Sequence, residues 1–328
     1  MIEVKQKPRE KMLEVHGLKK YFTSGGGMLQ SKQKAIKAVD DLSFFIYTGE
    51  TLGVVGESGC GKSTMGRTLL RLQEPTSGET IFDGQNINRL GKKKMRSLRK
   101  EMQMIFQDPY GSLNPRMTVG AMLGEIIHTH QIVPKKDTVP YIHRLLEDVG
   151  LRAEHYWRYP HEFSGGQRQR ISIARALAVK PKLIVCDEAV SALDVSVQAQ
   201  VLNLLQRLKR DYQLTYLFIS HDLSVVKHIS DRVAVMYLGQ IVELADKNDL
   251  YKQPQHPYTQ ALLSAIPSVG TDQKRERIIL KGDVPSPLNV PSGCRFHTRC
   301  PLAVEKCKTD VPAFREVAEG HFTACHLA

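Results

Sequence analysis

The feature that constrains this chain most is a glycine-rich loop that directly follows the short apolar strand LGVV and directly precedes a helical pattern. Glycines let backbone N–H groups turn inward around a phosphate, and the start of the following helix adds positive potential. In such a loop the lysine reaches the β- and γ-phosphates and the serine hydroxyl ligates Mg²⁺. We therefore predict a nucleotide-binding P-loop formed by Gly56, Glu57, Ser58, Gly59, Cys60, Gly61, Lys62, Ser63 and Thr64.

Short β-rich apolar runs alternate with longer helical patterns along the chain. Such runs are typical of buried parallel strands, and the alternation predicts an α/β fold with a central, mostly parallel sheet and an antiparallel β subdomain. The runs expected to be strands are 51–55, 183–187, 216–220 and 233–238, and the helical patterns are 63–73, 167–180 and 195–212.

Two changes of pattern predict the domain organisation. Residues 108–165 interrupt the alternation with Pro, Gly and two helical stretches, which indicates an inserted helical subdomain. After about residue 266 the composition shifts to Pro, Gly and Cys, beginning with the probable linker segment IPSVGTDQKRER. We expect a nucleotide-binding domain over 1–265 and a small cysteine-rich C-terminal module over 266–328.

Composition limits where the chain works and what it binds. In its 328 residues no apolar run approaches the roughly 18 residues of a membrane span, and the N-terminus is charged where a secretory signal would be apolar. This predicts a cytoplasmic protein. The net charge of +12 would suit nucleic acid, but the basic block at 92–100 lacks interleaved aromatic residues and is better explained as the solvated face of a helix. We expect no nucleic-acid partner.

An apolar strand ends in two acids, Asp187 and Glu188, at the position where ligands bind in open α/β sheets. Strand-ending acids often only face solvent, but beside a P-loop they have a chemical role. We expect Asp187 to bind Mg²⁺ through water and Glu188 to orient or deprotonate the attacking water, because phosphoryl transfer depends on positioning and charge stabilisation.

Further motifs follow in a fixed order: Gln107 after the strand QMIF, Ser164-Gly165-Gly166-Gln167 opening a helix, Asp194 within SALD, and His221 after the strand LFIS. Together with the P-loop they resemble ABC ATPases. The resemblance implies that Ser164, Gly165, Gly166 and Gln167 bind the γ-phosphate of ATP held by a second subunit, that Asp194 lies at the dimer interface, that His221 contacts the γ-phosphate, and that Gln107 helps to hold Mg²⁺ and couples the nucleotide to a membrane partner.

Two positions near these motifs required a choice. The family stacks an early aromatic residue on adenine; we assign this role to Tyr21, with its neighbour Phe22 as the competitor and core packing as the alternative. Relatives usually have Asp-Glu-Pro where this chain has Asp187-Glu188-Ala189. Proline would rigidify the turn that places the glutamate, but no reactive group is lost, so we still expect ATP hydrolysis.

Longer segments resemble the ATPases of oligopeptide/dipeptide permeases. They are GESGCGKST, IFQDPYGSLNPRMTVG, YPHEFSGGQRQR, SALDVSVQAQ and HDLSVVKHISDRVAVMYLG, followed by HPYTQALL and PSP in the tail. The early insertion TSGGGMLQSKQKAIKAVDD is similar to the F-type subunit. This resemblance implies ATP-driven peptide import, a heterodimer with a D-type paralogue, two transmembrane permease subunits, an extracytoplasmic peptide-binding protein, and a peripheral position on the cytoplasmic face of the membrane.

Four of the six cysteines gather near the end of the chain: Cys294, Cys300, Cys307 and Cys325. A cytosolic chain makes disulfides improbable, whereas four thiolates suit Zn²⁺ or a [4Fe–4S] cluster. Zinc usually prefers closer Cys pairs, and the resembling permease ATPases carry a cluster in this tail. We therefore expect [4Fe–4S] in a structural role, with zinc, or metal-free cysteines, as alternatives. Cys60 and Cys186 are expected to be packing residues.

Other functions remain to be compared with peptide import. A nickel or other small-solute importer would share the core ATPase motifs. A DNA-associated ABC ATPase would need a coiled-coil or zinc-bearing insertion, and no heptad array lies between Lys62 and Asp187. A ribosome-associated factor would need two cassettes, and the chain has one P-loop and one signature.

Overall fold

The computed structural model describes residues 9–23, 35–266 and 276–328. Most of the early insertion and the segment 267–275 of the expected linker lie outside these residues. Within them, the alternating pattern forms the α/β fold expected from the sequence. In the described part of the chain no helix has both the length and the apolar character needed to cross a membrane.

The larger sheet has eight strands in the order β11-β12-β10-β9-β3-β8-β7-β6. Five neighbouring strands, from β9 to β6, pair in parallel, and β10, β12 and β11 add antiparallel pairs at the other side. β3, β7 and β8 are buried at every residue, which explains their continuous apolar sequences. The strands are β3 (Thr51–Val55), β6 (Met102–Ile105), β7 (Leu183–Asp187), β8 (Thr215–Ile219), β9 (Arg232–Tyr237), β10 (Gln240–Asp246), β11 (Arg315–Ala318) and β12 (His321–Thr323).

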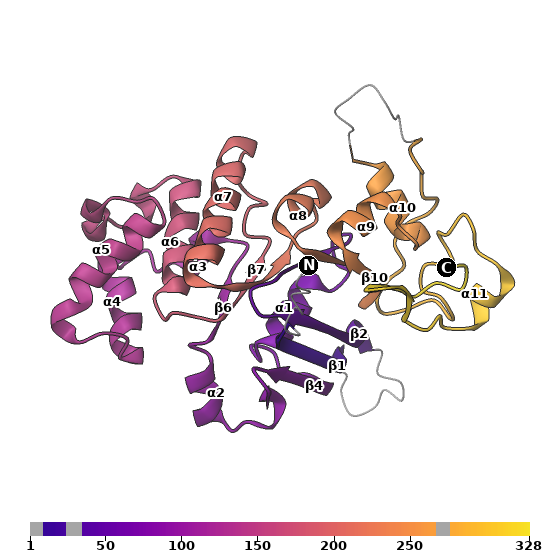
Figure 1. The fold of residues 1–328 in the computed structure, drawn as a ribbon, viewed down its shortest axis with the longest axis horizontal. Coiled ribbons are helices and arrows are strands. Elements are labelled where there is room, and N and C mark those ends of the chain that lie inside the picture. Colours follow the sequence, from indigo (N-terminus) through magenta and orange to yellow (C-terminus); the bar gives the residue numbers. More distant parts are fainter. Residues whose placement is uncertain (1–8, 24–34, 267–275) are drawn as a thin grey trace, which may run out of the picture.

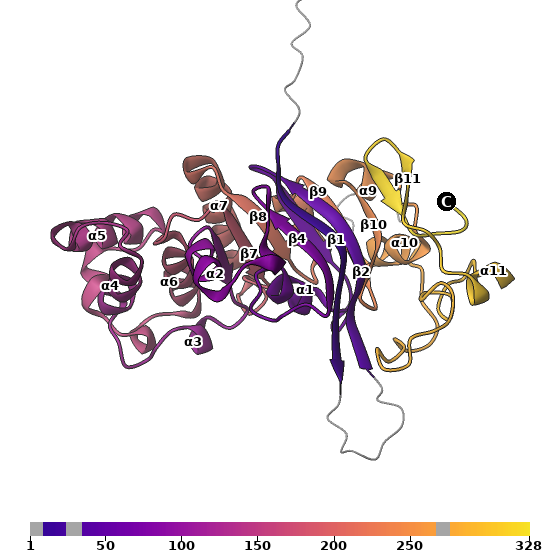
Figure 2. The ribbon, with the colours of Figure 1, turned by 90° about the horizontal axis from the view of Figure 1, so that it is seen from below.

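A second, antiparallel sheet has the order β2-β1-β4-β5. It packs on the side of the larger sheet that carries the first helix, where Val54 of β3 and Met65 of that helix share one apolar core with Leu13 of β1. Figure 2 shows its long strands running past the end of the larger sheet. The strands are β1 (Lys11–Thr23), β2 (Ala35–Tyr47), β4 (Ser77–Phe82) and β5 (Gln85–Asn86).

The helices divide between the two faces of the larger sheet. Val55, next to Val54 on β3, points to the opposite core, where it packs with residues of α6, α7 and α8. Figure 1 places α4 and α5 at one end of the molecule and the C-terminal segment at the other. The helices are α1 (Lys62–Leu69), α2 (Lys92–Leu98), α3 (Pro109–Ser112), α4 (Val119–His130), α5 (Thr138–Asp148), α6 (Gly165–Leu177), α7 (Val195–Tyr212), α8 (Leu223–Ile229), α9 (Lys247–Lys252), α10 (Pro257–Ser264) and α11 (Glu305–Thr309).

The C-terminal segment is attached to the larger sheet. β12 pairs antiparallel with β10, and the buried carboxylate of Glu243 on β10 lies 2.7 Å from His321 Nε2 on β12. The same carboxylate accepts hydrogen bonds from the backbone N–H groups of Gln255 and His256. One buried acid therefore holds together the sheet, the start of α10 and the end of the chain.

Candidate functional site

Four neighbouring parallel strands end at the same edge of the sheet, and the residues that follow them form the site. The glycine-rich loop follows β3, His221 follows β8, Asp187 and Glu188 lie at the end of β7, and Gln107 follows β6. Because these strands are parallel neighbours, their carboxyl ends bring residues far apart in sequence together. The spatial order β3-β8-β7-β6 could not be obtained from the motifs, which occur in a different order along the chain.

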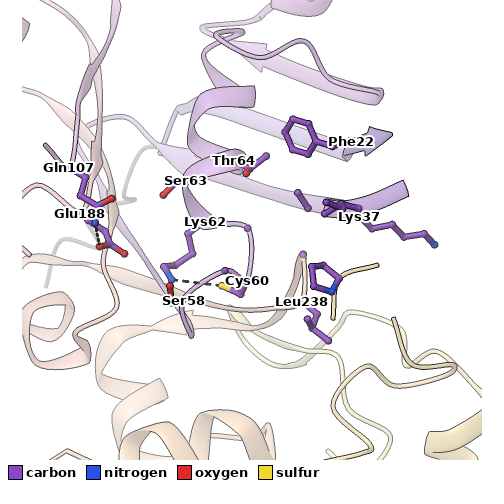
Figure 3. A pocket seen from close by; sticks show the side chains of 16 residues that line it. Phe22, Lys37, Ser58, Cys60, Lys62, Ser63, Thr64, Gln107, Glu188 and Leu238 are labelled. Atoms are coloured by element: carbon purple, nitrogen blue, oxygen red, sulfur yellow. Dashed lines mark hydrogen bonds between the residues drawn. The ribbon is translucent and has the colours of Figure 1, made fainter. Parts of the chain in front are cut away.

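The loop borders a cavity of about 370 Å³, shown in Figure 3. Gly61 has φ +106, and a Cβ there would lie 2.0 Å from the carbonyl oxygen of Ala38, so only glycine fits this bend. The lining residues are Phe22, Ile36, Lys37, Ala38, Ser58, Gly59, Cys60, Gly61, Lys62, Ser63, Thr64, Gln107, Glu188, Leu238, Gly239 and Pro287.

Lys62, at the start of α1, bends back over the loop. Its ammonium Nζ donates to the carbonyl oxygens of Gly56 at 2.7 Å and Glu57 at 3.0 Å. Cys60 is buried with its Sγ 3.8 Å from Nζ, and burial raises the pKa of its thiol, so it serves as a small neutral packing group in the loop. The ammonium is thus held beside the cavity, in reach of an anionic ligand.

Ser63 and Asp187 present oxygen atoms to the same point. Ser63 Oγ donates to Asp187 Oδ1 at 2.6 Å, and Arg67 lies 3.6 Å from Asp187 Oδ2. Burial raises the pKa of Asp187 although these neighbours favour its ionised form, and its buried Oδ2 accepts no hydrogen bond from the described residues. Hydroxyl and carboxylate oxygens with spare lone pairs are ligands that Mg²⁺ prefers, so the residues fit a magnesium site.

The carboxylate of Glu188 contacts both Gln107 and His221. Its Oε2 accepts from Gln107 Nε2 at 2.9 Å and lies 3.4 Å from His221 Nδ1. Its backbone has φ +49, and its carbonyl oxygen accepts from both the N–H and the hydroxyl of Ser191, at 3.1 and 3.0 Å. Ser191 therefore fixes the turn that follows Glu188, although Ala189 stands where proline would have rigidified it.

The signature residues lie outside the cavity of their own chain. Ser164 caps α6: its Oγ accepts from the N–H of Gln167, whose side chain accepts in return from the N–H of Ser164. Asp194 caps α7 with its Oδ1, and hydrogen bonds from Val197 and Ser196 lower its pKa. Ser164, Gly165, Gly166, Gln167 and Asp194 are absent from the lining of the P-loop cavity.

The aromatic residue that lines the cavity is Phe22, and the stacking of adenine on Tyr21 stays a prediction. Phe22 belongs to the lining, as Figure 3 shows, whereas Tyr21 does not. The hydroxyl of Tyr21 instead donates to Asp40, and burial, followed by this bond, raises its pKa. Successive side chains of a strand point to opposite faces, so only one of the two neighbours can line the cavity.

The four tail cysteines are free thiols near one another. Cys307 and Cys325 are buried, and Cys294 and Cys300 are partly buried. Burial, and then the neighbouring thiols, raises the pKa of Cys294 to about 11. Four sulfur atoms are the ligand type and number that a [4Fe–4S] cluster or a zinc ion requires. In the described ranges, however, no three His, Cys, Asp or Glu side chains are arranged to hold a metal ion. The geometry therefore does not support the expected [4Fe–4S] cluster or its zinc alternative.

Sequence reasoning did not anticipate that the tail borders the cavity. Pro287 belongs to the lining, and its carbonyl oxygen accepts from the N–H of Lys37 at 3.4 Å. Arg299 forms two hydrogen bonds with Glu57 of the loop, at 2.7 and 3.0 Å. The available signal was the sequence CRFHTRC, in which two arginines lie between two of the tail cysteines.

Known proteins share both parts of this chain. The family described as "ABC transporter" matches residues 39–191, and that described as "Oligopeptide/dipeptide transporter, C-terminal region" matches residues 242–307. The oligopeptide transport ATP-binding protein AppF of Bacillus subtilis (strain 168) is 56% identical over 97% of this chain and 98% of its own length. The putative oligopeptide transport ATP-binding protein YkfD of the same organism is 54% identical over 96% of this chain and 95% of its own.

Solved structures agree on the fold. The ATP-binding cassette MJ0796, in a dimeric post-hydrolysis state bound to ADP and Pi, superposes with a TM-score of 0.63 and 26% identity over 72% of this chain and 99% of that one. CbiO1 of Clostridium perfringens superposes equally well, with a TM-score of 0.63 and 22% identity over 74% of this chain and 92% of that one, and supports the fold alone. The chain belongs to the ATP-binding proteins of the ABC transporter family that carry the oligopeptide/dipeptide transporter C-terminal region.

Proposed function

We propose that this chain binds and hydrolyses ATP to power the import of oligopeptides or dipeptides through a membrane transporter. The observation that carries this proposal is the convergence of Lys62, Asp187, Glu188 and Gln107 at one sheet edge, in a chain whose tail matches the peptide-transporter C-terminal region. A nickel or other small-solute importer, and a DNA-associated ATPase, are not favoured, because the relatives named above are oligopeptide transport proteins over nearly their full length.

Hydrolysis is assigned to this chain's own side chains as follows. Loop N–H groups and Lys62 bind the β- and γ-phosphates. Ser63, Asp187 and Gln107 would hold Mg²⁺, which would neutralise charge on the phosphate oxygens. Glu188 orients and deprotonates the attacking water, because its carboxylate lies at the cavity within reach of Gln107 and His221. His221 then contacts the γ-phosphate.

A single subunit provides half of each catalytic site. The signature helix α6 and Asp194 stand outside the cavity of their own chain, so their N-terminal anion site is available to ATP bound by a second subunit. The similar cassette MJ0796 is dimeric in its ADP-bound structure. We assign the second position to a D-type paralogue, in a head-to-tail dimer that closes on ATP.

The membrane partners would be two permease subunits, with an extracytoplasmic peptide-binding protein delivering substrate. A groove of about 310 Å³ is lined by Phe106, Met104, Ile126 and other residues. Phe106 directly precedes Gln107, which lines the nucleotide cavity. A permease segment bound in this groove would sense the movement of Gln107. In this proposed arrangement the chain would lie peripherally on the cytoplasmic face of the membrane.

The [4Fe–4S] cluster stays a separate proposal for the four tail cysteines, with zinc as the alternative. Its support is that all four thiols are free and near one another, and its weakness is the arrangement described above. Anaerobic purification with metal analysis tests it. About four irons per chain, lost in Cys300→Ser, would support the cluster; one zinc would replace it, and no metal would leave four packing thiols.

Transport by the assembled importer in proteoliposomes tests the main proposal. Glu188→Gln should retain ATP binding and lower ATP turnover and peptide uptake together, by about 10²- to 10⁴-fold, because it removes the general base. Normal peptide uptake by this variant would contradict the assignment. ATP turnover stimulated by nickel and not by peptides would redirect it to a small-solute importer.

A further inference from the structure

The turn 294–300 of the tail lies directly against the nucleotide site. It reads Cys294-Arg295-Phe296-His297-Thr298-Arg299-Cys300, and its one aromatic ring of the phenyl type, Phe296, is 1% exposed. The Phe296 ring packs 5.3 Å from the ring of Tyr237 and 5.3 Å from that of Tyr258. The buried aromatic cluster fixes the turn, so the side chains on either side of Phe296 project from a rigid base.

Arg299 projects from this base onto the phosphate loop. Its two terminal nitrogens donate to Glu57 Oε2 at 2.7 Å and Glu57 Oε1 at 3.0 Å, the two-pronged geometry of a strong ion pair. The Arg299 side chain is 8% exposed, so solvent screens the pair only weakly. Tyr258 holds the same loop residue by accepting from the N–H of Glu57 at 3.0 Å.

Glu57 is in turn linked to the residue that faces the phosphates. Its carbonyl oxygen accepts from Lys62 Nζ at 3.0 Å, so the carboxylate is bonded to the tail while the carbonyl group of the same residue is bonded to Lys62. Arg295, at the other end of the turn, donates to the carbonyl oxygen of Leu238, a cavity-lining residue. The turn therefore contacts the site at two separate points.

The charge balance of the loop depends on Arg299. Glu57 places a carboxylate in the loop that receives the anionic phosphates of ATP, and among the described residues Arg299 is its only ion-pair partner. Without the guanidinium this carboxylate would be an unpaired negative charge on the phosphate loop, and the loop would lose the contact that holds Glu57 in place. Both consequences oppose ATP binding.

We propose that Arg299 is a positioning residue for ATP binding: by pairing with Glu57 it neutralises the carboxylate of the phosphate loop and holds the loop in its binding conformation. The C-terminal turn is then a working part of the nucleotide site, whatever the tail cysteines bind. A purely structural role would also lower stability when Arg299 is removed, but it would not depend on the charge of Glu57.

Calorimetric titration of the full chain with ATP separates these roles. Arg299→Ala should raise the Kd for ATP roughly tenfold, since one partner of a buried charge pair is removed. Arg299→Lys keeps the charge and loses the second hydrogen bond to Glu57. Its Kd for ATP should lie between that of wild type and that of Arg299→Ala. Adding Glu57→Gln to Arg299→Ala should return the Kd to within about threefold of wild type, because the unpaired carboxylate is gone.

Lys308→Ala is the matched control, because it removes a tail cation whose partner, Glu305, is 87% exposed. It should leave the Kd unchanged. The proposal is overturned if Arg299→Ala binds ATP like wild type, or if the double variant binds as weakly as Arg299→Ala alone. Should Arg299→Ala fail to fold, Arg299→Gln takes its place, alone and together with Glu57→Gln: a wild-type Kd in Arg299→Gln would overturn the proposal.

Discussion

Gln107 Nε2 donates to Glu188 Oε2 at 2.9 Å, joining the end of β6 to the end of the neighbouring strand β7 beside the nucleotide cavity. The bond orients the carboxylate that we assign as general base, and it makes the position of Gln107 sensitive to that carboxylate. Phe106, the preceding residue, lines the neighbouring groove. A movement of Glu188 would therefore reach Gln107 and, through the next residue, Phe106, the groove where we place a membrane subunit.

Gln107→Ala tests this link. Because the variant removes the hydrogen bond that orients Glu188, ATP turnover should fall about tenfold or more, while ATP binding should change less than about threefold. Steady-state ATPase assays and ATP titration of the assembled transporter measure the two effects. Gln206→Ala on α7 is the control, since that side chain bonds to His228 far from the cavity. Equal ATP turnover in Gln107→Ala and Gln206→Ala would contradict a role for Gln107 in orienting Glu188.

Phe22→Ala tests the aromatic wall of the cavity. Loss of ring contact with the base should weaken ATP binding by roughly three- to tenfold, corresponding to the usual strength of aromatic contacts. Tyr21→Phe, which removes only the hydroxyl bonded to Asp40, should keep wild-type affinity. Fluorescence titration with an adenine nucleotide compares the affinities of the two variants, and weaker binding by Tyr21→Phe than by Phe22→Ala would support adenine stacking on Tyr21.

Ser63→Ala tests the magnesium site. The variant removes the hydroxyl that lies 2.6 Å from Asp187 Oδ1, so half-maximal ATPase activity should require about tenfold more Mg²⁺. ATPase rates across a Mg²⁺ titration provide the measurement. Ser224→Ala, on the exposed side of α8, should follow the wild-type curve. An unchanged Mg²⁺ requirement in Ser63→Ala would place the metal elsewhere.

Stability should depend on pH through His256. Burial lowers its pKa from 6.5 to about 4, and in the folded protein its neutral Nδ1 accepts from the N–H of Tyr258. The unfolded chain binds the proton on His256 more tightly than the folded protein does. The contribution of neutral His256 to the free energy of unfolding is therefore complete above pH 6.5 and is lost as the pH falls toward 4.

Urea unfolding at pH 7 and pH 5 measures this contribution. The free energy of unfolding should fall by about 2 kcal/mol more in wild type than in His256→Asn, in which asparagine can still cap α10 without titrating. Glu243, whose carboxylate accepts from the N–H of His256, is present in both proteins, so the difference isolates the histidine. Identical pH dependence in the two proteins would contradict the prediction.

The α/β fold and the family could be predicted from local sequence because both depend on short segments. The strand, glycine loop and Lys62 are contiguous, and continuous apolar runs such as 183–187 suffice to identify buried parallel strands. Local sequence could not decide between Tyr21 and Phe22, because both are aromatic and only the register of β1 against β2 decides which side chain faces the cavity.

The sequence by itself determined the chemistry of the phosphate loop, because those groups are neighbours in the chain and backbone geometry alone brings them together. The tertiary structure decided the rest. It joined Gln107 to Glu188 across 81 positions and Arg299 to Glu57 across 242. Such pairs depend on strand order and on the burial of Phe296, and these are set by the packing of the whole core, which no local pattern encodes.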